Sequence, residues 1–426
     1  MRFLVAVAGL PLLAVAEVHN LSLRSAVDLA LRQNPDVLIS RLNEQRAALG
    51  VNVARDPFVP KLFVGSGAAY TYGFPMSVEG SAPSVVQARG VASVFNKQQR
   101  LMVEATKADA LTATRDGQAR RDEVVFRVVE FYLDAERKGR LAAMADRQVD
   151  SARKLEQVVR ARIDEGRELL VEARRAALEV ARAEHRKLEL QTDRDQAQAA
   201  LATVLGLEPG DMARPFGDED RAAPAMPASV EEAAQSALRE NREIARMEAD
   251  MAAKGIRVRA ERAAKLPRLD LVAQYGLLAR FNNYEDFFRR FQRHNAQIGV
   301  SVQVPVFAGR AADALAAQAE TEVAKLRLEI ARTRGRIHQE TQRRYLEVNR
   351  AESARQLSRQ ALEVARADLD VQLARMDEGR AGVKQVEEAR MEEHRKWIEY
   401  YDAQASLERA RYALLDQTGA LVAALR

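Results

Sequence analysis

The chain has 426 residues, of which 30% are charged and only 5% aromatic, with a formal net charge of +5. It contains no cysteine, which excludes disulfides, thiolate metal sites and a cysteine nucleophile. Arginine and glutamate alternate along the chain and form no basic block, a pattern typical of solvated helix faces that argues against nucleic-acid binding. The composition predicts long helices in preference to a thick globular core.

Residues 1–16, MRFLVAVAGLPLLAVA, combine an early Arg2, an apolar run and the small-residue stretch Ala14-Val15-Ala16. This pattern predicts a secretory signal peptide. The alternative is an apolar helix that packs on the rest of the chain. No later segment reaches the roughly 20 apolar residues of a membrane-spanning helix.

The next segment predicts a helix of roughly 35 residues, with Ser22 as its N-cap and Pro57 and Pro60 at its end. Two stretches without a helical pattern follow, LFVGSGAAYTY (62–72) and SVVQARGVASVF (84–95). Both alternate weakly with period two, which indicates half-buried strands, and 84–95 is the poorer of the two.

Residues 84–208 contain no proline and predict long helices, broken at the DEGR of 164–167, where glycine permits a helix end. Residues 207–228 hold four prolines and little periodicity, so they predict a linker.

The second half of the chain repeats the first. SVEEAAQSALREN (229–241) matches SLRSAVDLALRQN (22–34) at an offset of 207 residues, and Gly379 matches Gly166 at an offset of 213. The second copy therefore also predicts one long helix at its start, with Ser229 as the N-cap and Pro267 at its end. A repeat this long is a duplicated half-molecule rather than a solenoid unit. The predicted organisation is therefore a first repeat over 17–206, the linker, and a second repeat over 229–426.

In the second repeat, RLDLVAQY (268–275) and QIGVSVQVPVF (297–307) alternate clearly, with Pro267 before the first and Pro305 within the second. One interpretation is a small sheet packed on a helix in water. The other is a membrane β-barrel, whose strands need about 9–11 residues. Four strands cannot close a barrel, so the second interpretation requires an oligomer whose chains share one barrel.

The loop FNNYEDFFRRFQRHN (281–295) collects aromatic residues and arginines between these two strands. Such a mixture suits a membrane-surface aromatic belt, and an amphipathic packing segment is an equal alternative.

Apolar residues in 357–376 form two heptad ladders, Leu357, Val364, Val371 and Leu362, Leu369, Met376. The two ladders lie on nearly opposite sides of a helix, since each residue turns it by about 100°. This favours a helix with a neighbour on each side, as in a closed wall of helices, over a helix buried in a bundle.

Several motifs follow one another along the chain: two copies of SxxxAxxxALxxN, Pro60-Lys61-Leu62 and Pro267-Arg268-Leu269, VPVFAGR (304–310) and LLDQTG (414–419). In this order they resemble the TolC family of Gram-negative outer-membrane efflux proteins. The resemblance covers essentially all of 20–425. It implies a homotrimer with a shared twelve-stranded outer-membrane barrel and a long helical barrel in the periplasm. It also implies the role of an exit duct for tripartite efflux or type I secretion, coupled to a periplasmic adaptor and an inner-membrane transporter.

The resemblance also implies roles for particular residues. Docking of the adaptor falls on the two hairpin tips, at Asp164, Glu165, Gly166, Arg167, Asp377, Glu378, Gly379 and Arg380. The alternative is that DEGR is only a stable turn. Acids that close the periplasmic end fall on Glu172 and Glu388, whereas Gln385 stands where the family usually has an aspartate, with Arg175 and Lys384 nearby. The chain is expected to enter barrel strands at Pro60, Pro267 and Pro305.

Nothing in the sequence favours an enzyme, a cofactor or a metal site: the five histidines are dispersed, and no phosphate loop or nucleophile elbow is present. Two other interpretations stay open, a periplasmic coiled-coil adaptor or scaffold without a channel and a cytoplasmic structural coiled coil. The two hairpins and the four strands argue against both. The sequence leaves the transported substrate undetermined.

Overall fold

The computed structural model describes residues 17–67, 84–216, 224–278, 292–306 and 310–425, so the predicted signal peptide lies outside the described residues. The chain forms two compact units, and each takes segments from both repeats. The hairpin unit comprises residues up to 40, 118–242 and 334–426, and the sheet unit comprises 41–117 and 243–333. We describe each unit by itself.

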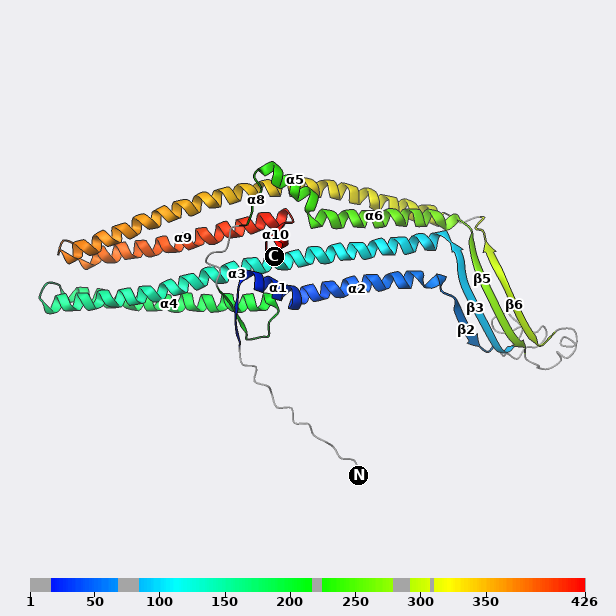
Figure 1. Ribbon diagram of the computed structural model, residues 1–426, viewed down its shortest axis with the longest axis horizontal. Helices are drawn as coiled ribbons and strands as arrows, with labels where there is room; N and C mark the ends of the chain where they lie inside the picture. The colour runs from blue at the N-terminus through cyan, green and yellow to red at the C-terminus, as the bar shows by residue number, and fades with distance from the viewer. Residues whose placement is uncertain (1–16, 68–83, 217–223, 279–291, 307–309, 426) are drawn as a thin grey trace, which may run out of the picture. The chain divides into compact units, whose positions relative to one another are not determined.

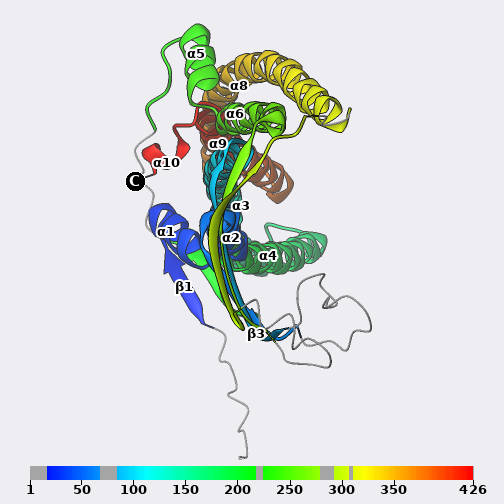
Figure 2. The ribbon, with the colours of Figure 1, turned by 90° about the vertical axis from the view of Figure 1, so that its right-hand side faces the viewer.

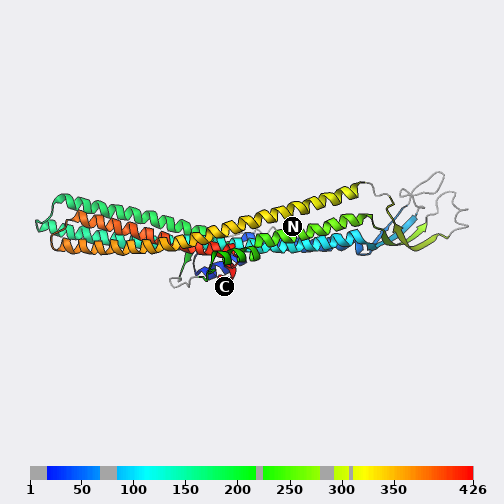
Figure 3. The ribbon, with the colours of Figure 1, turned by 90° about the horizontal axis from the view of Figure 1, so that it is seen from above.

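Two helical hairpins dominate the hairpin unit (Figures 1 and 3). The first joins α3 (Lys97–Asp164) to α4 (Leu170–Leu205), and the second joins α8 (Ala311–Asp377) to α9 (Val383–Gln417). α3 and α8 begin in the sheet unit and continue into the hairpin unit. The predicted long helices, broken at the two DEGR sites, are confirmed, because proline-free runs rich in Ala, Leu, Arg and Glu propagate a helix readily.

The single helix expected at the start of each repeat is wrong. The first repeat has α1 (Leu23–Gln33) and α2 (Pro35–Arg55), and the second has α5 (Val230–Glu240) and α6 (Arg242–Arg262). Asn34 leaves the helical conformation because Pro35 disfavours helix in the residue before it. The Asn34 Oδ1 then accepts a hydrogen bond from the Asp36 amide at 2.8 Å, which starts the next helix.

The N-caps of the first and third of these helices agree with the prediction. Ser22 accepts from the Ser25 amide, and Ser229 accepts from the Glu232 amide at 3.1 Å. The Glu232 carboxylate in turn accepts from the Ala228 amide at 2.8 Å. Both helices therefore begin where the small polar residue satisfies a free amide of the first turn.

The duplication extends to the contacts at these helix breaks. The Asn34 side-chain amide donates to the Val204 carbonyl at 2.7 Å, and the Asn241 amide donates to the Gln417 carbonyl at 3.5 Å. Two residues after each acceptor, a glycine with positive φ, Gly206 or Gly419, marks the end of the helix. Each repeat thus fastens the end of its hairpin to the break in its own first helix.

Around this region lies the largest apolar core of the hairpin unit. Val124, Val125, Val128, Val129 and Tyr132 of α3 are fully buried in it, together with residues of α1, α4, α9 and α10 (Leu421–Ala424). Beside this core, β1 (Val18–Leu21) pairs in parallel with β4 (Met212–Pro215). Neither strand was predicted, and β4 lies inside the segment interpreted as a linker.

The sheet unit contains one antiparallel sheet in the order β2-β3-β5-β6, seen nearly edge-on in Figure 2. Its strands are β2 (Lys61–Gly65), β3 (Ser84–Asn96), β5 (Arg268–Leu278) and β6 (His294–Gln303). β3, the least convincing strand in the sequence, is the longest and pairs on both sides. The four predicted strands are confirmed where they are described; residues 68–72 and most of the aromatic loop, 281–291, lie outside the described residues.

Short 3-10 turns lead from the helices into the sheet. Asp56–Phe58 follows α2, and Ala263–Lys265 follows α6. Pro60 then stands directly before β2 and Pro267 directly before β5, whereas Pro305 comes two residues after the end of β6. Proline suits these positions because it supplies no amide to the hydrogen-bond ladder.

Within the described residues, none of the helices contains an apolar stretch long enough to cross a membrane.

Candidate functional site: the two hairpin tips

The two tips share one backbone turn. Gly166 has φ of 72° and donates to the Ile163 carbonyl at 2.9 Å, while the Arg167 amide reaches back to the Arg162 carbonyl at 2.8 Å. At the second tip, Gly379 has φ of 73° and donates to the Met376 carbonyl, and the Arg380 amide reaches the Arg375 carbonyl at 2.7 Å. This is the Schellman arrangement, which ends a helix by placing glycine in the left-handed conformation.

The repeated hexapeptide is therefore a repeated helix stop. Aspartate and glutamate complete the last turn of the helix, glycine supplies the positive φ, and arginine donates the long backbone bond. A Cβ at Gly166 or Gly379 would meet no atom within 4 Å, so only the backbone conformation demands glycine there.

The charges of each tip pair locally. Arg167 lies 3.2 Å from Glu165, and Arg380 lies 3.0 Å from Glu378, with all four side chains exposed. Exposed pairs of this kind contribute little stability, about 0–1 kcal/mol. The tips therefore present matched positive and negative charges that stay available to another molecule.

Arg162 joins the two tips. Its guanidinium donates to the Met376 carbonyl at 2.8 Å and lies 3.8 Å from the Asp377 carboxylate. Beneath it, an apolar cluster takes residues from both hairpins: Leu155, Val159, Ala176, Met376, Ala381, Val383 and Val386. The two tips are thus packed against each other within one chain.

The residues that begin the helix after each turn differ between the two hairpins. In the first hairpin, Leu169 and Leu170 are 70% and 76% exposed, and Val171 is also exposed. In the second hairpin, Val383 occupies the position of Leu170 and is only 2% exposed. The first tip therefore carries an apolar patch, Leu169 to Val171, that nothing in the described part of this chain covers.

Glu172, one of the two acids implied at the periplasmic end, is half-buried on the third residue of α4. One of its oxygens lies 2.6 Å from Arg175, and the other is buried without a hydrogen-bond partner among the described residues. Glu388 is different: its side chain is 59% exposed and lies 3.8 Å from Lys384.

Glu387, not Glu388, is the acid of α9 that faces Glu172. Burial raises the pKa of Glu387, and the negative charges of Glu179 and Glu172 raise it further. No pattern in the sequence singles out Glu387. The available signal was helical phase, because one residue turns a side chain by about 100° and moves it from the outer face to the face between hairpins.

Gln385 has a structural task at the start of α9. Its side-chain oxygen accepts a hydrogen bond from the Gly382 amide at 2.6 Å, which satisfies one of the free amides of the first turn. The departure from the aspartate that the family resemblance implies at this position therefore keeps an acceptor on the helix start while it removes a charge.

Among the described residues, no three His, Asp or Glu side chains gather in a way that could hold a metal ion.

Comparison with known proteins agrees with this architecture. The family model described as outer membrane efflux protein matches residues 26–207 and 233–425, one match in each repeat. The chain belongs to this family. A search of curated protein sequences gives no match.

Solved structures show the same fold at low identity. A membrane protein from Pseudomonas aeruginosa is 17% identical, with a TM-score of 0.76, covering 95% of this chain and 91% of that one. The outer membrane protein VceC of Vibrio cholerae is 17% identical, with a TM-score of 0.73 and coverages of 93% and 96%. The MtrE outer membrane channel of Neisseria gonorrhoeae is 16% identical, with a TM-score of 0.74 and coverages of 94% and 89%.

These findings confirm the predicted fold class, family and location. The protein is an outer-membrane efflux channel of a Gram-negative bacterium that works with the other components of a pump. The interpretation as an adaptor or scaffold is not favoured.

Proposed function

We propose that three copies of this chain form the exit duct, with one twelve-stranded barrel in the outer membrane and one helical barrel in the periplasm. The duct receives its substrate from an inner-membrane transporter through a periplasmic adaptor, in tripartite efflux or in type I secretion. The observation that carries the proposal is the four-stranded sheet, in which β2 and β6 each have one edge without a partner strand among the described residues.

The two outer strands suit a closed ring. Because all three pairings are antiparallel, β2 and β6 run in opposite directions. Joining β6 of one copy to β2 of the next therefore continues the antiparallel order and removes both free edges. Ile298, Val300 and Val302 of β6 are 77%, 61% and 59% exposed and share one face, as expected of residues that meet lipid.

The helices support a neighbour on each side. Leu362 and Met376 of one heptad ladder are buried within the chain, whereas Leu357 and Val364 of the other ladder are 68% and 70% exposed. An apolar ladder left in water on a long helix is unfavourable by about 25 cal/mol per Å² of apolar surface. We infer that the exposed ladder packs against the next copy.

Cysteine pairs test the closure of the ring, because the natural chain has no cysteine. Each variant carries one cysteine on β2 and one on β6, in a panel that scans the register and includes Val64→Cys with Val300→Cys. Oxidation is expected to join three chains in a ring, and the bands are read on a non-reducing gel. The single variant Val300→Cys is the control, since it can link at most two chains. A panel that never yields a trimer contradicts the proposal.

We propose further that the adaptor docks on the hairpin tips, where the exposed Leu169–Val171 patch and the paired charges of Arg167 and Arg380 lie together. Arg167→Glu with Arg380→Glu would place unpaired negative charge on both tips and is expected to weaken adaptor binding and export. Leu169→Ser with Leu170→Ser tests the apolar part. If all four changes leave co-purification with the adaptor intact, docking lies elsewhere.

Glu172 and Glu388 are proposed as acids of the periplasmic end, where three-fold symmetry would triple each charge around the lumen and favour cations. Single-channel recording of Glu172→Gln and Glu388→Gln in planar bilayers measures this. A lower cation selectivity is expected, and unchanged conductance and cation response in both variants contradict the assignment.

A further inference from the structure

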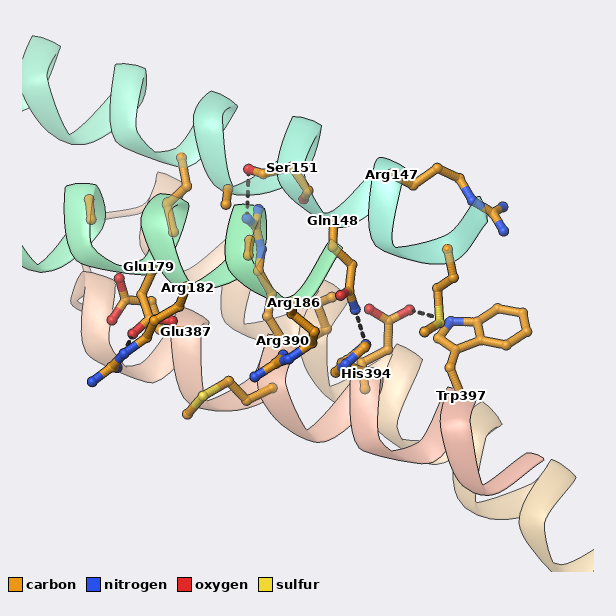
Figure 4. A pocket seen from close by; sticks show the side chains of 18 of the residues that line it. Arg147, Gln148, Ser151, Glu179, Arg182, Arg186, Glu387, Arg390, His394 and Trp397 are labelled. Atoms are coloured by element: carbon orange, nitrogen blue, oxygen red, sulfur yellow. Dashed lines mark hydrogen bonds and ion pairs between the residues drawn. The ribbon is translucent and has the colours of Figure 1, made fainter. Parts of the chain in front are cut away.

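We propose that the hairpin unit binds an amphipathic organic monoanion, a carboxylate or sulfonate with an aromatic or alicyclic body, in a pocket between its two hairpins. We call it the arginine pocket. It has a volume of about 340 Å³ and is lined by α3, α4, α8 and α9 (Figure 4). Cavities for small ligands are usually about 300–1,000 Å³, so the pocket suits a compact molecule. The site lies within one chain and does not depend on the proposed trimer or adaptor.

Its walls offer a place for an apolar body. Leu155, Ala176, Leu369 and Met391 line the pocket with short or flexible apolar side chains. Trp397 closes one side, and its indole N–H donates to Glu393 at 3.1 Å. Such a mixture of apolar walls and a few placed polar groups is what small-molecule sites normally present.

The arginines of the pocket fall into two classes. Arg182 pairs with Glu179, and Arg366 lies over the Trp397 ring at 4.2 Å with Glu393 at 4.0 Å. Arg186 and Arg147 line the same pocket and have no acidic partner among the described residues. Figure 4 shows Arg186 in the middle of the pocket near Arg390 and His394.

Two buried donors also lack partners. Arg390 donates from its Nη1 to the Ser151 carbonyl at 2.8 Å, but its Nε is buried without an acceptor in the described part of the chain. The Gln148 side-chain amide bonds to Nδ1 of His394, and because that amide donates, the hydrogen of the neutral ring lies on Nε2. This Nε2 is likewise buried without a partner among the described residues.

The charge states fit an anion. Burial and the positive charge of Arg186 together lower the pKa of His394 from 6.5 to about 4, so the ring is neutral and donates one hydrogen bond at physiological pH. A buried donor without an acceptor is unfavourable. A carboxylate or sulfonate beside Arg186 would accept from both Arg390 and His394 and remove that cost while it pairs with the free guanidinium.

The other side of the pocket limits the ligand to one negative charge. Glu387 and Glu179 line that side, and one oxygen of Glu387 is buried without a hydrogen-bond partner in the described chain. A second anionic group would meet these carboxyl groups, whereas an apolar end or a hydroxyl group would not. Glu393 also lies near Arg390, but it accepts from Trp397 and lies 4.0 Å from Arg366. A dianion would therefore meet carboxyl groups, and a cation would face the unpaired Arg186 and Arg147.

Trp397 provides the measurement, because it is the only tryptophan in the chain and lies in the pocket wall. The full-length protein in nanodiscs is titrated with 4-phenylbutanoate, and with 4-phenylbutan-1-ol and 4-phenylbutylammonium as neutral and cationic counterparts. Tryptophan emission excited at 295 nm and isothermal calorimetry follow the binding. Saturable binding of the carboxylate is expected, at least about tenfold tighter than that of the alcohol or the amine.

Arg186→Gln is expected to weaken carboxylate binding at least about tenfold, since it removes the free charge from the pocket. Arg409→Gln is the matched control, an exposed arginine of α9 that does not line the pocket. Helix content and oligomeric mass of both variants are compared with the natural protein, and Arg147→Gln serves as a second test if Arg186→Gln is misfolded. Equal binding of the alcohol, an unchanged affinity of both pocket variants, or no binding of the carboxylate would overturn the proposal.

Discussion

The first and second hairpins have the same backbone turn at their tips, but the residues that follow the turn differ in exposure. The turn is therefore fixed by the need to end a helix, whereas the exposure of the next residues is not. Both turns place glycine at a φ near 70° and use the same two backbone bonds. Immediately afterwards, Leu170 of the first hairpin is 76% exposed, while Val383 at the matching position is 2% exposed. The second tip buries its apolar residue within the chain, whereas the first leaves its apolar residues exposed.

At the ends opposite the tips, the two hairpins again share a backbone conformation and differ in side chains. Gly206 and Gly419 both end a helix with positive φ, and both lie against the break in the first helix of their repeat. Side chains beside them have diverged. Thr203 of the first hairpin is exposed and bonds to the carbonyl of Ala199, whereas the matching Asp416 is half-buried near Asp122. The two repeats therefore share the glycine turns of the backbone but differ in the side chains beside these turns.

The largest effect is expected where the two hairpins are most alike. A Cβ on Gly206 would lie 2.8 Å from the Gln33 carbonyl oxygen, and a Cβ on Gly419 would lie 2.9 Å from the Glu240 oxygen. Gly206→Ala and Gly419→Ala combine this backbone collision with an unfavourable φ, so each should lower the free energy of unfolding by about 3 kcal/mol or more. Denaturant unfolding in detergent, followed by circular dichroism, measures it.

Gly139→Ala is the matched control for these two variants. Gly139 lies inside α3, its φ is not positive, and a Cβ added there would meet no atom within 4 Å. Alanine at this position should raise the stability by up to about 1 kcal/mol, because it has the higher helix propensity. If Gly206→Ala and Gly419→Ala differ strongly from each other, the two helix ends are not equivalent and the comparison fails.

A pH-dependent effect is expected where the hairpins have diverged. The pKa of Asp416 is raised from 3.8 to about 7, chiefly by burial and then by the negative charge of Asp122, with Arg344 opposing them. Since the folded state binds this proton more tightly than the unfolded state, ionisation opposes folding. The stability that Asp416 contributes is complete below pH 4 and is lost as the pH rises towards 7.

Asp416→Asn removes the ionisation and should therefore stabilise the protein at pH 8 and leave it unchanged at pH 4. The whole difference between 3.8 and about 7 corresponds to about 4 kcal/mol at most. Because the side chain is partly exposed and solvent screens its charge, we expect about 2 kcal/mol. The measurement is unfolding at both pH values. Thr203→Ser is the control in the first hairpin and should show no pH dependence; a pH-independent Asp416→Asn effect would mean that the carboxyl is already solvated.

Hydrophobic periodicity and the positions of proline and glycine were enough to predict the four long helices, the four strands and the turns at Gly166 and Gly379. Alternation failed to rank β3 correctly, because a central strand is placed by the partners on both its sides and not by its own pattern. The helix breaks at Asn34 and Asn241 were not predicted, because the helical pattern of apolar residues continues across them. Pro35 was the available signal for the first break. Glu387 was missed because its role depends on facing Glu172 and Glu179 of the other hairpin, a contact that no local pattern encodes.

The smallest of the three effects tests the tips directly. Val383→Ala removes two buried methyl groups from the apolar cluster between the tips and should cost about 1.5 kcal/mol, at about 0.8 kcal/mol for each buried group. Leu170→Ala removes more apolar surface, but from a side chain that is already exposed, so the unfolding free energy should change by less than about 0.5 kcal/mol. Hydrogen exchange of the tip amides and denaturant unfolding measure both. An equal loss of stability in the two variants would mean that Leu170 is covered within the assembled channel, and the exposed patch of the first tip would then belong to the contact between copies and not to the adaptor.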